Sequence, residues 1–431
     1  MALCLLTSLL RALSFRMSKI ALFLLFALSV SAEDWTQFRG PLANGHTSAK
    51  NLPLHWSDTK NVTWKVAIPG HGWSSPLLLN GKIYLTTAVP ENAGKDNSDR
   101  SLRAMCLNAQ NGKPLWDIEV FKQDGAKTHK IHKKNSHATP TPIIEDGKIY
   151  IHFAHEGTAC LDLFGKVIWK NRDLGYRPLH GGGGSPLIHK DLLIFHADAV
   201  SDPAIYALNK KTGKVAWKTM RKTDARRKFS FSTPILIEVK GKTQLISPHS
   251  GAVCAYDPDN GKEIWRVNYG EGYSVVPRPV YGHGMVFVCT GYDRANLLAI
   301  RVDGKGDVTD SHVEWELSKR ISLNPSPVLV GDQLYIVADS GTATCLDAKT
   351  GEDHWSERVG SGSSASPLYD SVQGRIYFQD EWGTGTVIAA GKEFKKLAEN
   401  KIESRTFANY LPADGVLFIR TEKSLYRIEE K

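Results

Sequence analysis

The stretch CLDAKTGEDHW, residues 345–355, decides the fold because the chain repeats the same phrase several times. Every copy runs from a small Ala or Cys through an apolar residue, a turn and a Gly to a closing Trp. The other copies are CLNAQNGKPLW (106–116), CLDLFGKVIW (160–169), ALNKKTGKVAW (207–217), AYDPDNGKEIW (255–265) and the longer AIRVDGKGDVTDSHVEW (299–315). With Trp64, the repeated Trp positions lie 40 to 53 residues apart. A regular period of this length is typical of repeat architectures.

Each interval also holds an earlier half, in which two apolar runs flank a turn. Examples are SSPLLLNGKIYLTT (74–87), PTPIIEDGKIYIHF (140–153) and NPSPVLVGDQLYIVAD (324–339). The NG, DG and GD pairs between alternating hydrophobic residues are hairpin signals. No segment shows a sustained helical period of 3.6 residues. One repeat therefore predicts four antiparallel strands, A to D, with the Ser/Thr-x-Pro sequence at strand A and the Trp on strand D.

Four strands in 40 to 50 residues are typical of a β-propeller blade. Six units lie between Trp64 and Trp355, and a seventh runs from residue 364 to residue 398. The last segment, residues 405–431, supplies only strands A to C, and residues 54–68 at the other end of the chain supply the missing strand D. We predict an all-β, eight-bladed propeller of four-stranded antiparallel blades over residues 51–431. Its N-terminal strand completes the C-terminal blade and closes the ring; seven blades are the alternative.

The repeat also explains the Trp and Cys residues. The Trp residues recur too regularly for a binding stripe, so we expect them to pack between adjacent blades. Cys106, Cys160 and Cys345 share one repeat position with alanines of the other copies, which predicts a small buried apolar group at that position. The odd number of five widely spaced cysteines after residue 32 does not describe a disulfide framework.

Residues 1–32 resemble a secretory signal peptide, with Met17 as a possible true start. Removing Arg11, Arg16 and Lys19 lowers the formal charge from +9 to +6, a mild bias that does not predict nucleic-acid binding. No later stretch reaches the roughly 18 apolar residues of a membrane span. We expect a monomeric periplasmic or secreted protein with an N-terminal extension at residues 33–50.

The Gly-Lys-x-x-Trp motif resembles the PQQ-type repeat of the quinoprotein alcohol dehydrogenase-like superfamily. Within it, the chain is most similar to secreted bacterial PQQ-like propeller proteins. The phrases that carry this similarity are WTQFRGP (35–41), GWSSPL (72–77), HKKNSHATPTP (132–142), HGGGGSP (180–186) and YSVVPRPVYGHG (273–284). The outer-membrane assembly factor BamB, an eight-bladed binding scaffold, is a relative, although this chain lacks the lipid-anchoring cysteine.

In a propeller the D–A and B–C loops share one face, which we call the funnel face. The A–B and C–D turns share the other, the turn face. The turn face collects ordinary turn sequences, whereas the funnel face collects the unusual residues. Arg278 stands where neighbouring repeats place Ser or Thr, and Trp73 and Trp382 lie outside the repeated Trp positions. The candidate ligand-binding residues are His71, Trp73, His137, His180, His249, Tyr273, Arg278, Asp293, Arg294, Asn324 and Trp382.

We predict a binding or scaffolding protein with a polar funnel, whose ligand is a carbohydrate, a peptide or another envelope protein. The alternative is a PQQ-dependent dehydrogenase. In such an enzyme Arg278 would bind the quinone carboxylates and Trp73 would stack on the quinone ring. Asn324 would be a calcium ligand, and Asp293 would be the base. Such enzymes often carry a vicinal disulfide, a haem motif and long insertions, all of which this chain lacks. We therefore expect no cofactor and assign no catalytic residue.

The sequence gives weaker support for two other kinds of site, a metal site and a phosphate-binding loop. The histidines at 71, 137, 180 and 249 share the funnel face, but no HExxH-like spacing occurs and the nearby lysines oppose a cation. We therefore expect no bound metal. The glycines of HGGGGSP (180–186) lack the Lys-Ser/Thr of a phosphate loop and lead into a strand, so we expect them to permit close backbone approach.

Overall fold

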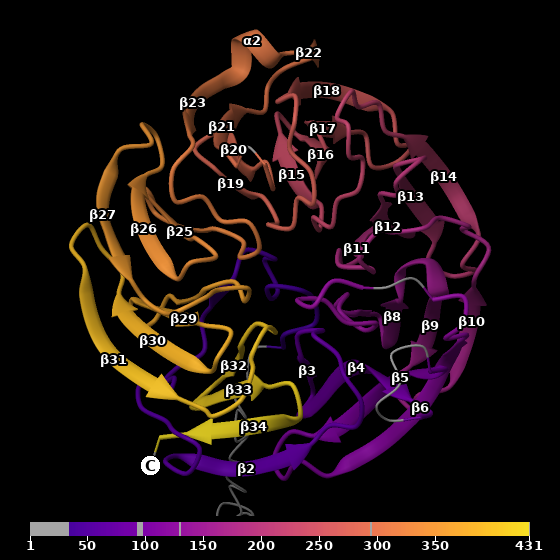
Figure 1. Cartoon of the computed structure of the whole chain (residues 1–431), viewed down its shortest axis with the longest axis vertical. Coiled ribbons are helices and arrows are strands. Elements are labelled where there is room, and N and C mark those ends of the chain that lie inside the picture. The colour runs from indigo at the N-terminus through magenta and orange to yellow at the C-terminus, as the bar shows by residue number, and fades with distance from the viewer. Residues whose placement is uncertain (1–33, 93–97, 129–130, 294, 431) are drawn as a thin grey trace, which may run out of the picture. The chain divides into compact units, whose positions relative to one another are not determined.

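Eight small sheets lie around a central axis and form an eight-bladed propeller (Figure 1), which confirms the predicted fold class and blade count. This computed structural model describes residues 34–92, 98–128, 131–293 and 295–430. The predicted signal peptide, with Met17, and Arg294 lie outside the described residues. Among the residues that the structure describes, no helix has the length and apolar character needed to span a membrane.

Blades 1 to 4 follow one another along the chain, each with its strands in sequence order. Blade 1 contains β3 (Leu77–Leu79), β4 (Lys82–Pro90), β5 (Arg100–Asn108) and β6 (Pro114–Gln123). Blade 2 contains β7 (Ile143–Glu145), β8 (Lys148–His152), β9 (Thr158–Asp162) and β10 (Val167–Asn171), with the short 3-10 helix η1 (Ala154–Glu156). Blade 3 contains β11 (Leu187–His189), β12 (Leu192–Ala197), β13 (Ala204–Asn209) and β14 (Val215–Met220). Blade 4 contains β15 (Ile235–Val239), β16 (Lys242–His249), β17 (Ala252–Tyr256) and β18 (Glu263–Asn268).

Blades 5 to 8 repeat this pattern with three additions. Blade 5 contains β19 (Val280–Gly282), β20 (Met285–Cys289), β21 (Leu297–Arg301) and β23 (Val313–Leu317), and its insertion carries β22 (Gly306–Asp307) and α2 (Thr309–His312). Blade 6 contains β24 (Val328–Val330), β25 (Gln333–Val337), β26 (Thr342–Asp347) and β27 (Asp353–Arg358). Blade 7 contains β28 (Leu368–Asp370), β29 (Arg375–Gln379), β30 (Thr384–Ala389) and β31 (Lys395–Lys401), and β1 (His46–Thr47) pairs with β28 in parallel. Blade 8 contains β32 (Leu411–Ala413), β33 (Val416–Arg420), β34 (Ser424–Glu429) and β2 (Val62–Ala67).

The two ends of the chain meet in blade 8. Strand β2 pairs with β34 in antiparallel register, from Val62 opposite Ile428 to Ala67 opposite Ser424. In Figure 1 the indigo β2 lies beside the yellow β34. The predicted ring closure is therefore confirmed, and it leaves β34 paired on both edges, with β33 on one side and β2 on the other.

The repeated Trp residues join neighbouring blades. The indole Nε1 of Trp64, Trp116, Trp169, Trp217, Trp315 and Trp355 donates to a backbone carbonyl beside the C–D turn of the next blade, at 2.9–3.2 Å. A Cβ on the turn glycine Gly213 would lie 2.4 Å from the Trp169 ring. Gly213 also has a φ of 71°. The motif Gly therefore serves both the turn and the contact with the Trp of the preceding blade.

Side chains at the entry to the innermost strands form a ring of hydrogen bonds around the channel, which we call the inner ring. In seven blades the side chain at the entry to strand A accepts a hydrogen bond from the equivalent backbone N–H of the preceding blade, at 2.8–3.3 Å. The acceptors are Thr141, Ser185, Thr233, Ser326, Ser366, Asn409 and Ser75. Blade 5 has Arg278 at this position, so the ring lacks a hydroxyl between Thr233 and Ser326.

Residues 34–50 cross the propeller on its turn face. Trp35 bridges to Leu78 in blade 1, and Thr36 accepts a hydrogen bond from Ile144 in blade 2. Farther along, β1 pairs with blade 7, and Lys50 reaches the turn at Gly415 in blade 8. Arg39 Nη2 also donates to the Pro327 carbonyl of blade 6. Because blades 2 and 6 face each other across the ring, this segment passes the central axis, as the indigo trace in Figure 1 shows. We call residues 34–50 the N-terminal crossing.

The cysteines within the described residues, Cys106, Cys160, Cys254, Cys289 and Cys345, are all free and buried. Cys106, Cys160 and Cys345 occupy equivalent C strands of different blades, so they do not meet. Burial raises the pKa of Cys160 to about 11. These thiols fill space as the repeat predicted.

Candidate functional site

A pocket of about 240 Å³ opens on the funnel face, on the side of the channel formed by blades 2 to 6. It is lined by His132, Lys134, Asn135, Thr139, His180, Gly183, Phe229, Phe231, Tyr273, Ser274, Val276, Tyr292 and Asn324. Almost all of them come from D–A loops, and Tyr292 comes from the B–C loop of blade 5. The loops that the sequence predicted to share a face therefore build a common pocket.

Aromatic rings form much of the wall. Phe229 lies 6.0 Å from Phe231 and 5.4 Å from Tyr273, measured between ring centres, and Tyr273 lies 6.2 Å from Tyr292. The guanidinium of Arg227 covers the Tyr273 ring at 4.5 Å. Such a wall offers flat apolar area with few rotatable bonds to immobilise, which favours binding of a ring or a large apolar group.

Polar groups converge on the same space. The rings of His132 and His180 are 5.7 Å apart, and burial followed by nearby positive charge lowers the pKa of both. Both imidazoles are therefore neutral at pH 7, each with one donor and one acceptor nitrogen. The amide of Asn324 donates to the Tyr292 hydroxyl at 3.2 Å. The pocket thus combines apolar walls with uncharged hydrogen-bonding groups and one charged side chain, that of Lys134.

Lys134 spans the mouth of the channel. It belongs to the loop that enters blade 2, yet its Nζ lies 3.2 Å from Asp339 Oδ2 and 2.8 Å from Glu381 Oε1, in blades 6 and 7. Although burial opposes it, hydrogen bonding to Glu381 and the charge of Asp339 raise the pKa of Lys134. Asp339 also accepts hydrogen bonds from the backbone N–H groups of Leu323 and Asn324. This bridge holds the blade 2 loop across the channel and shapes one side of the pocket.

Three of the predicted site residues, His180, Tyr273 and Asn324, line this pocket. Asp293 is next to it, because its carboxylate accepts a hydrogen bond from the Tyr273 hydroxyl at 3.3 Å. Arg294 lies outside the described residues.

The predicted residues from blades 1, 2 and 7 lie elsewhere. Trp73 is buried and packs on Phe407 at 4.6 Å, with the His71 ring edge-on at 4.9 Å. His137 is within hydrogen-bond distance of the Gln123 amide, and burial lowers its pKa to about 3. Trp382 is 53% exposed, beneath the guanidinium of Arg405.

The last two predicted residues are buried in the propeller. His249 is within hydrogen-bond distance of the Ser250 carbonyl and of Cys254 Sγ, and burial places its pKa well below the usual value. The Arg278 guanidinium donates to the carbonyls of Pro234 and Phe38, at 2.9–3.2 Å. Arg278 therefore binds the N-terminal crossing and does not line the pocket.

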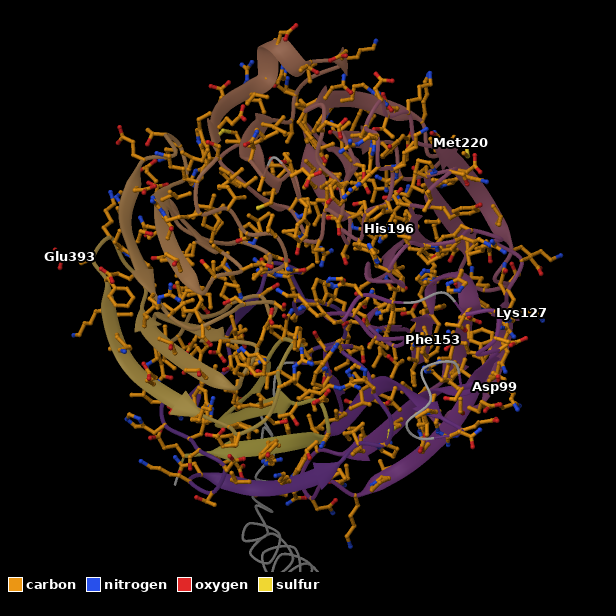
Figure 2. The ribbon with its side chains drawn as sticks, in the orientation of Figure 1. Asp99, Lys127, Phe153, His196, Met220 and Glu393 are labelled. Atoms are coloured by element: carbon orange, nitrogen blue, oxygen red, sulfur yellow. The ribbon has the colours of Figure 1, made fainter. Side chains whose placement is uncertain are left out.

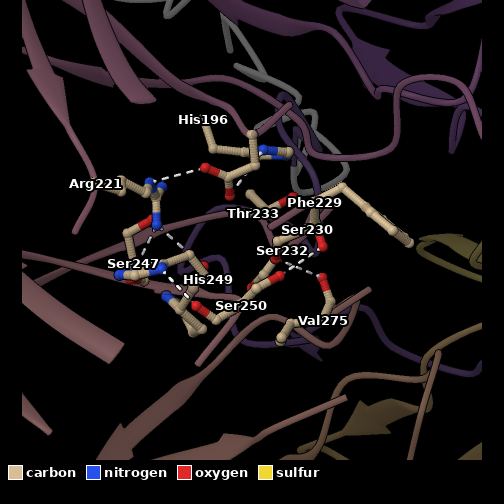
Figure 3. A network of polar contacts seen from close by, with 12 residues as sticks. His196, Arg221, Phe229, Ser230, Ser232, Thr233, Ser247, His249, Ser250 and Val275 are labelled. Carbon is tan, nitrogen blue, oxygen red and sulfur yellow. Dashed lines mark hydrogen bonds and ion pairs between the residues drawn. The ribbon is translucent and has the colours of Figure 1, made fainter. Parts of the chain in front are cut away.

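A buried polar network supports the aromatic wall from behind (Figure 3). The Ser250 hydroxyl donates to the Phe229 carbonyl at 2.7 Å, and the Ser230 hydroxyl donates to the Val275 carbonyl at 3.1 Å. Deeper in the network, Arg221 Nε lies 3.1 Å from Asp198 Oδ1, and both side chains are fully buried. Figure 2 shows His196 of this network inside the ring, whereas Met220, at the end of β14, lies near the rim. The wall is thus held by fixed hydrogen bonds before any ligand arrives.

The buried His152 lies near this network and should make the free energy of unfolding depend on pH. Burial, with a smaller effect of His155, lowers the pKa of His152 to about 3. In the unfolded chain a histidine titrates near pH 6.5, so only the unfolded state gains this proton between about pH 6 and pH 4. The stability that His152 contributes is therefore present above pH 6.5 and is lost as the pH falls.

Replacing His152 with Gln should reduce the pH slope of the unfolding free energy by about 1.4 kcal/mol per pH unit in that window. Denaturant titrations from pH 4 to pH 7 measure this slope. The control is Tyr176→Phe, which removes the hydroxyl beside His152 Nε2 without removing an imidazole. Burial raises the pKa of Asp198 to about 7, so Asp198 contributes a pH slope of the opposite sign. This contribution is present in the wild type and in both variants, and it cancels when their slopes are compared. Equal slopes in the wild type and His152→Gln would contradict the prediction.

The comparisons with known proteins agree with this geometry. The family model described as outer membrane protein assembly factor BamB matches residues 47–173, 106–357 and 311–396. A quinoprotein ethanol dehydrogenase of Pseudomonas aeruginosa is 29% identical over 203 residues, which are 42% of this chain and 32% of that enzyme. The match thus spans about a third of that relative's length.

Two solved structures share the fold. BamB from Moraxella catarrhalis aligns with a TM-score of 0.58 at 12% identity, over 85% of this chain and 97% of that one. Quinohemoprotein alcohol dehydrogenase from Comamonas testosteroni aligns with a TM-score of 0.67 at 10% identity, over 92% of this chain and 80% of that one. At such identities the likeness concerns the fold alone.

Several pocket residues were absent from the predicted set, among them His132, Lys134, Phe229 and Tyr292. The string HKIHKKNSH (129–137) contains two of these residues, but its lysines indicated only charge that opposes a cation. The carboxylates that receive Lys134 lie 205 and 247 residues away in the chain. Nothing in the local sequence shows that a loop of blade 2 reaches blades 6 and 7.

Proposed function

Since this chain belongs to the family of PQQ-like repeat β-propellers whose model is described as outer membrane protein assembly factor BamB, we propose that it is a binding or scaffolding protein. Its ligand enters the pocket on the funnel face. With the predicted signal peptide, this function would be exercised in the periplasm or outside the cell. The family description favours a polypeptide partner, and a peptide segment is the ligand that we propose.

The single observation that carries the proposal is the shape of the central channel. The N-terminal crossing lies over its end on the turn face, whereas the loops at the other end line the pocket of about 240 Å³. A cavity of about 150 Å³ holds benzene, and drug-sized ligands occupy roughly 300–1,000 Å³. The pocket therefore suits a single ring-sized group, such as one aromatic side chain of a peptide.

The lining matches such a group. Phe229, Phe231 and Tyr273 provide apolar contact, and Asn324, His132 and His180 can bond peptide N–H and C=O groups. The rigid support behind Phe229 limits the ordering cost of binding. A sugar ring would use the same features, so a carbohydrate ligand is an outcome that the experiment below distinguishes.

The quinone-dependent alternative has less support. Arg278, proposed for the quinone carboxylates, is buried and bonded to backbone carbonyls, and Trp73 is buried against Phe407. Over the described residues, no group of three or more His, Cys, Asp and Glu side chains is placed to hold a metal ion. Arg278 and Trp73 are therefore not placed to hold a quinone in this pocket. A rise in melting temperature with PQQ and calcium that Arg278→Ala abolishes would favour the enzyme.

Replacing Tyr273 with Ala should weaken peptide binding at least tenfold, because it removes an aromatic wall and the hydroxyl that bonds Asp293. The probes are fluorescent hexapeptides that differ only in a central Phe, Tyr, Leu or Ala, measured by anisotropy. The control is Tyr281→Ala, a partly exposed Tyr of the same blade at the turn face. Equal affinity for the Phe and Ala peptides would contradict the proposal. Binding of methyl glycosides alone would identify a carbohydrate-binding protein.

A further inference from the structure

Two buried arginines lie beneath the inner ring without an acidic partner. Arg39 of the N-terminal crossing is 2% exposed, and Arg278 of blade 5 is 3% exposed. Among the described residues neither forms an ion pair, in contrast to Arg221, which faces Asp198 at 3.1 Å. Two positive charges are therefore removed from water with no negative charge beside them.

The two arginines are neighbours in space. Arg278 Nη1 donates to the carbonyl of Phe38, the residue directly before Arg39. Arg39 Nη2 donates to the carbonyl of Pro327. The backbone N–H of Arg278 donates to the hydroxyl of Ser326, which directly precedes Pro327 in the chain. Burial, followed by the charge of Arg278, lowers the pKa of Arg39. The pair is thus close enough for mutual repulsion.

Arg39 also retains unused donors. Its Nη2 donates to the carbonyls of Asn44 and Pro327, but Nε and Nη1 are buried with no hydrogen-bond partner among the residues that the structure describes. Since a guanidinium carries five N–H groups, three of them are unsatisfied. The Arg278 guanidinium, by comparison, has every nitrogen bonded to a carbonyl.

Leaving such groups unpaired is costly. A buried unpaired charge is strongly disfavoured, and most side chains avoid the penalty by losing their charge. Arginine cannot do so, because its guanidinium stays protonated in proteins. Carbonyl dipoles compensate Arg278 in part, but they do not reach Nε and Nη1 of Arg39. The missing component is a negative charge at that side of Arg39.

We propose that the propeller binds a monatomic anion, chloride under most conditions, beside Nε and Nη1 of Arg39, where the charge of Arg278 adds to the attraction. The site lies below the inner ring, at the position where Arg278 replaces a ring hydroxyl. We propose a single atom because the Arg39 guanidinium is closely surrounded on its other side, where a Cβ on Gly45 would lie 2.5 Å from Nη2. The anion would link the N-terminal crossing to the ring, so its binding would stabilise the closed end of the channel.

The test is thermal unfolding of the chain from residue 33 in sodium chloride, with sodium gluconate keeping the ionic strength constant. From 5 to 500 mM chloride the wild-type melting temperature should rise saturably by roughly 3 °C. Arg39→Gln should abolish the dependence. The matched control is Arg420→Gln, another buried arginine without an ion pair among the described residues, and it should keep the dependence. A flat wild-type curve, or an unchanged dependence in Arg39→Gln, would overturn the proposal.

A second measurement needs no variant. Crystals of the wild-type protein grown in sodium bromide should show an anomalous peak beside Arg39 Nη1. Density without an anomalous signal there would mean that water solvates the pair, and the proposal would fail. A rise in melting temperature with sulfate or phosphate, but not with chloride, would overturn the monatomic assignment in favour of an oxyanion.

Discussion

Replacing Trp265 with Ala is expected to lower the free energy of unfolding by about 3–5 kcal/mol. Trp265 is fully buried, in a cluster with Val267, Val286 and Ile300 that joins blades 4 and 5. Its Nε1 donates to the Gln244 side chain at 2.9 Å, so the substitution also leaves a buried amide oxygen without its donor. Urea titration measures the loss as a lower midpoint with an unchanged slope.

Trp382 provides the matched control. It is the same residue type, but it is 53% exposed and stands outside the repeat. Trp382→Ala should change the stability by no more than about 0.5 kcal/mol. If both variants unfolded at the same urea concentration, packing between blades would not be the role of the repeated Trp.

Removing the N-terminal residues through Ile68 is expected to open the ring and to cause aggregation. The deleted part contains β2, which pairs with β34 along its whole length. Without β2, the edge of β34 (Ser424–Glu429) presents unpaired N–H and C=O groups that can pair with another copy. The contact of Trp64 with the Ala109 carbonyl of blade 1 is lost as well. Size-exclusion chromatography should show that most of the protein has left the monomer peak.

A shorter truncation separates closure from the N-terminal crossing. A chain that begins at Asn51 loses the crossing but keeps β2, so it should remain a folded monomer with a lower melting temperature. If the chain that begins after Ile68 were also monomeric and folded, strand β2 would not be what closes the ring.

The repeat made most of the fold predictable. The Gly of a short C–D turn must adopt positive φ, and the Trp that follows needs apolar cover, so both requirements are local and repeat in blades 1 to 4 and 6. One departure, at Trp265 of blade 4, also has a local cause. Trp265 cannot dock on a short C–D turn in blade 5, because residues 302–312 enlarge that turn, and it is instead buried beside β22.

The site was less predictable. His180, Tyr273 and Asn324 were predicted because loops of one face converge in any propeller. Lys134 was not, because its partners Asp339 and Glu381 come from the opposite side of the ring. Arg278 was recognised as unusual, but its direction depends on Phe38, a residue of another element.

The architecture could be predicted without coordinates: the repeated turn-and-Trp phrase, the incomplete last copy and the spare strand at residues 54–68 favoured eight blades and a closed ring over the alternative of seven. The folded chain was needed to show which loops line the pocket, which loop crosses the mouth of the channel and which arginines are buried without an acid among the described residues. The difference arises from how far apart in the sequence the contacting residues lie. Strand alternation, turn φ and Trp packing are satisfied within one repeat or between neighbours, whereas the pocket and the buried charges depend on contacts across the ring between residues 200 or more positions apart.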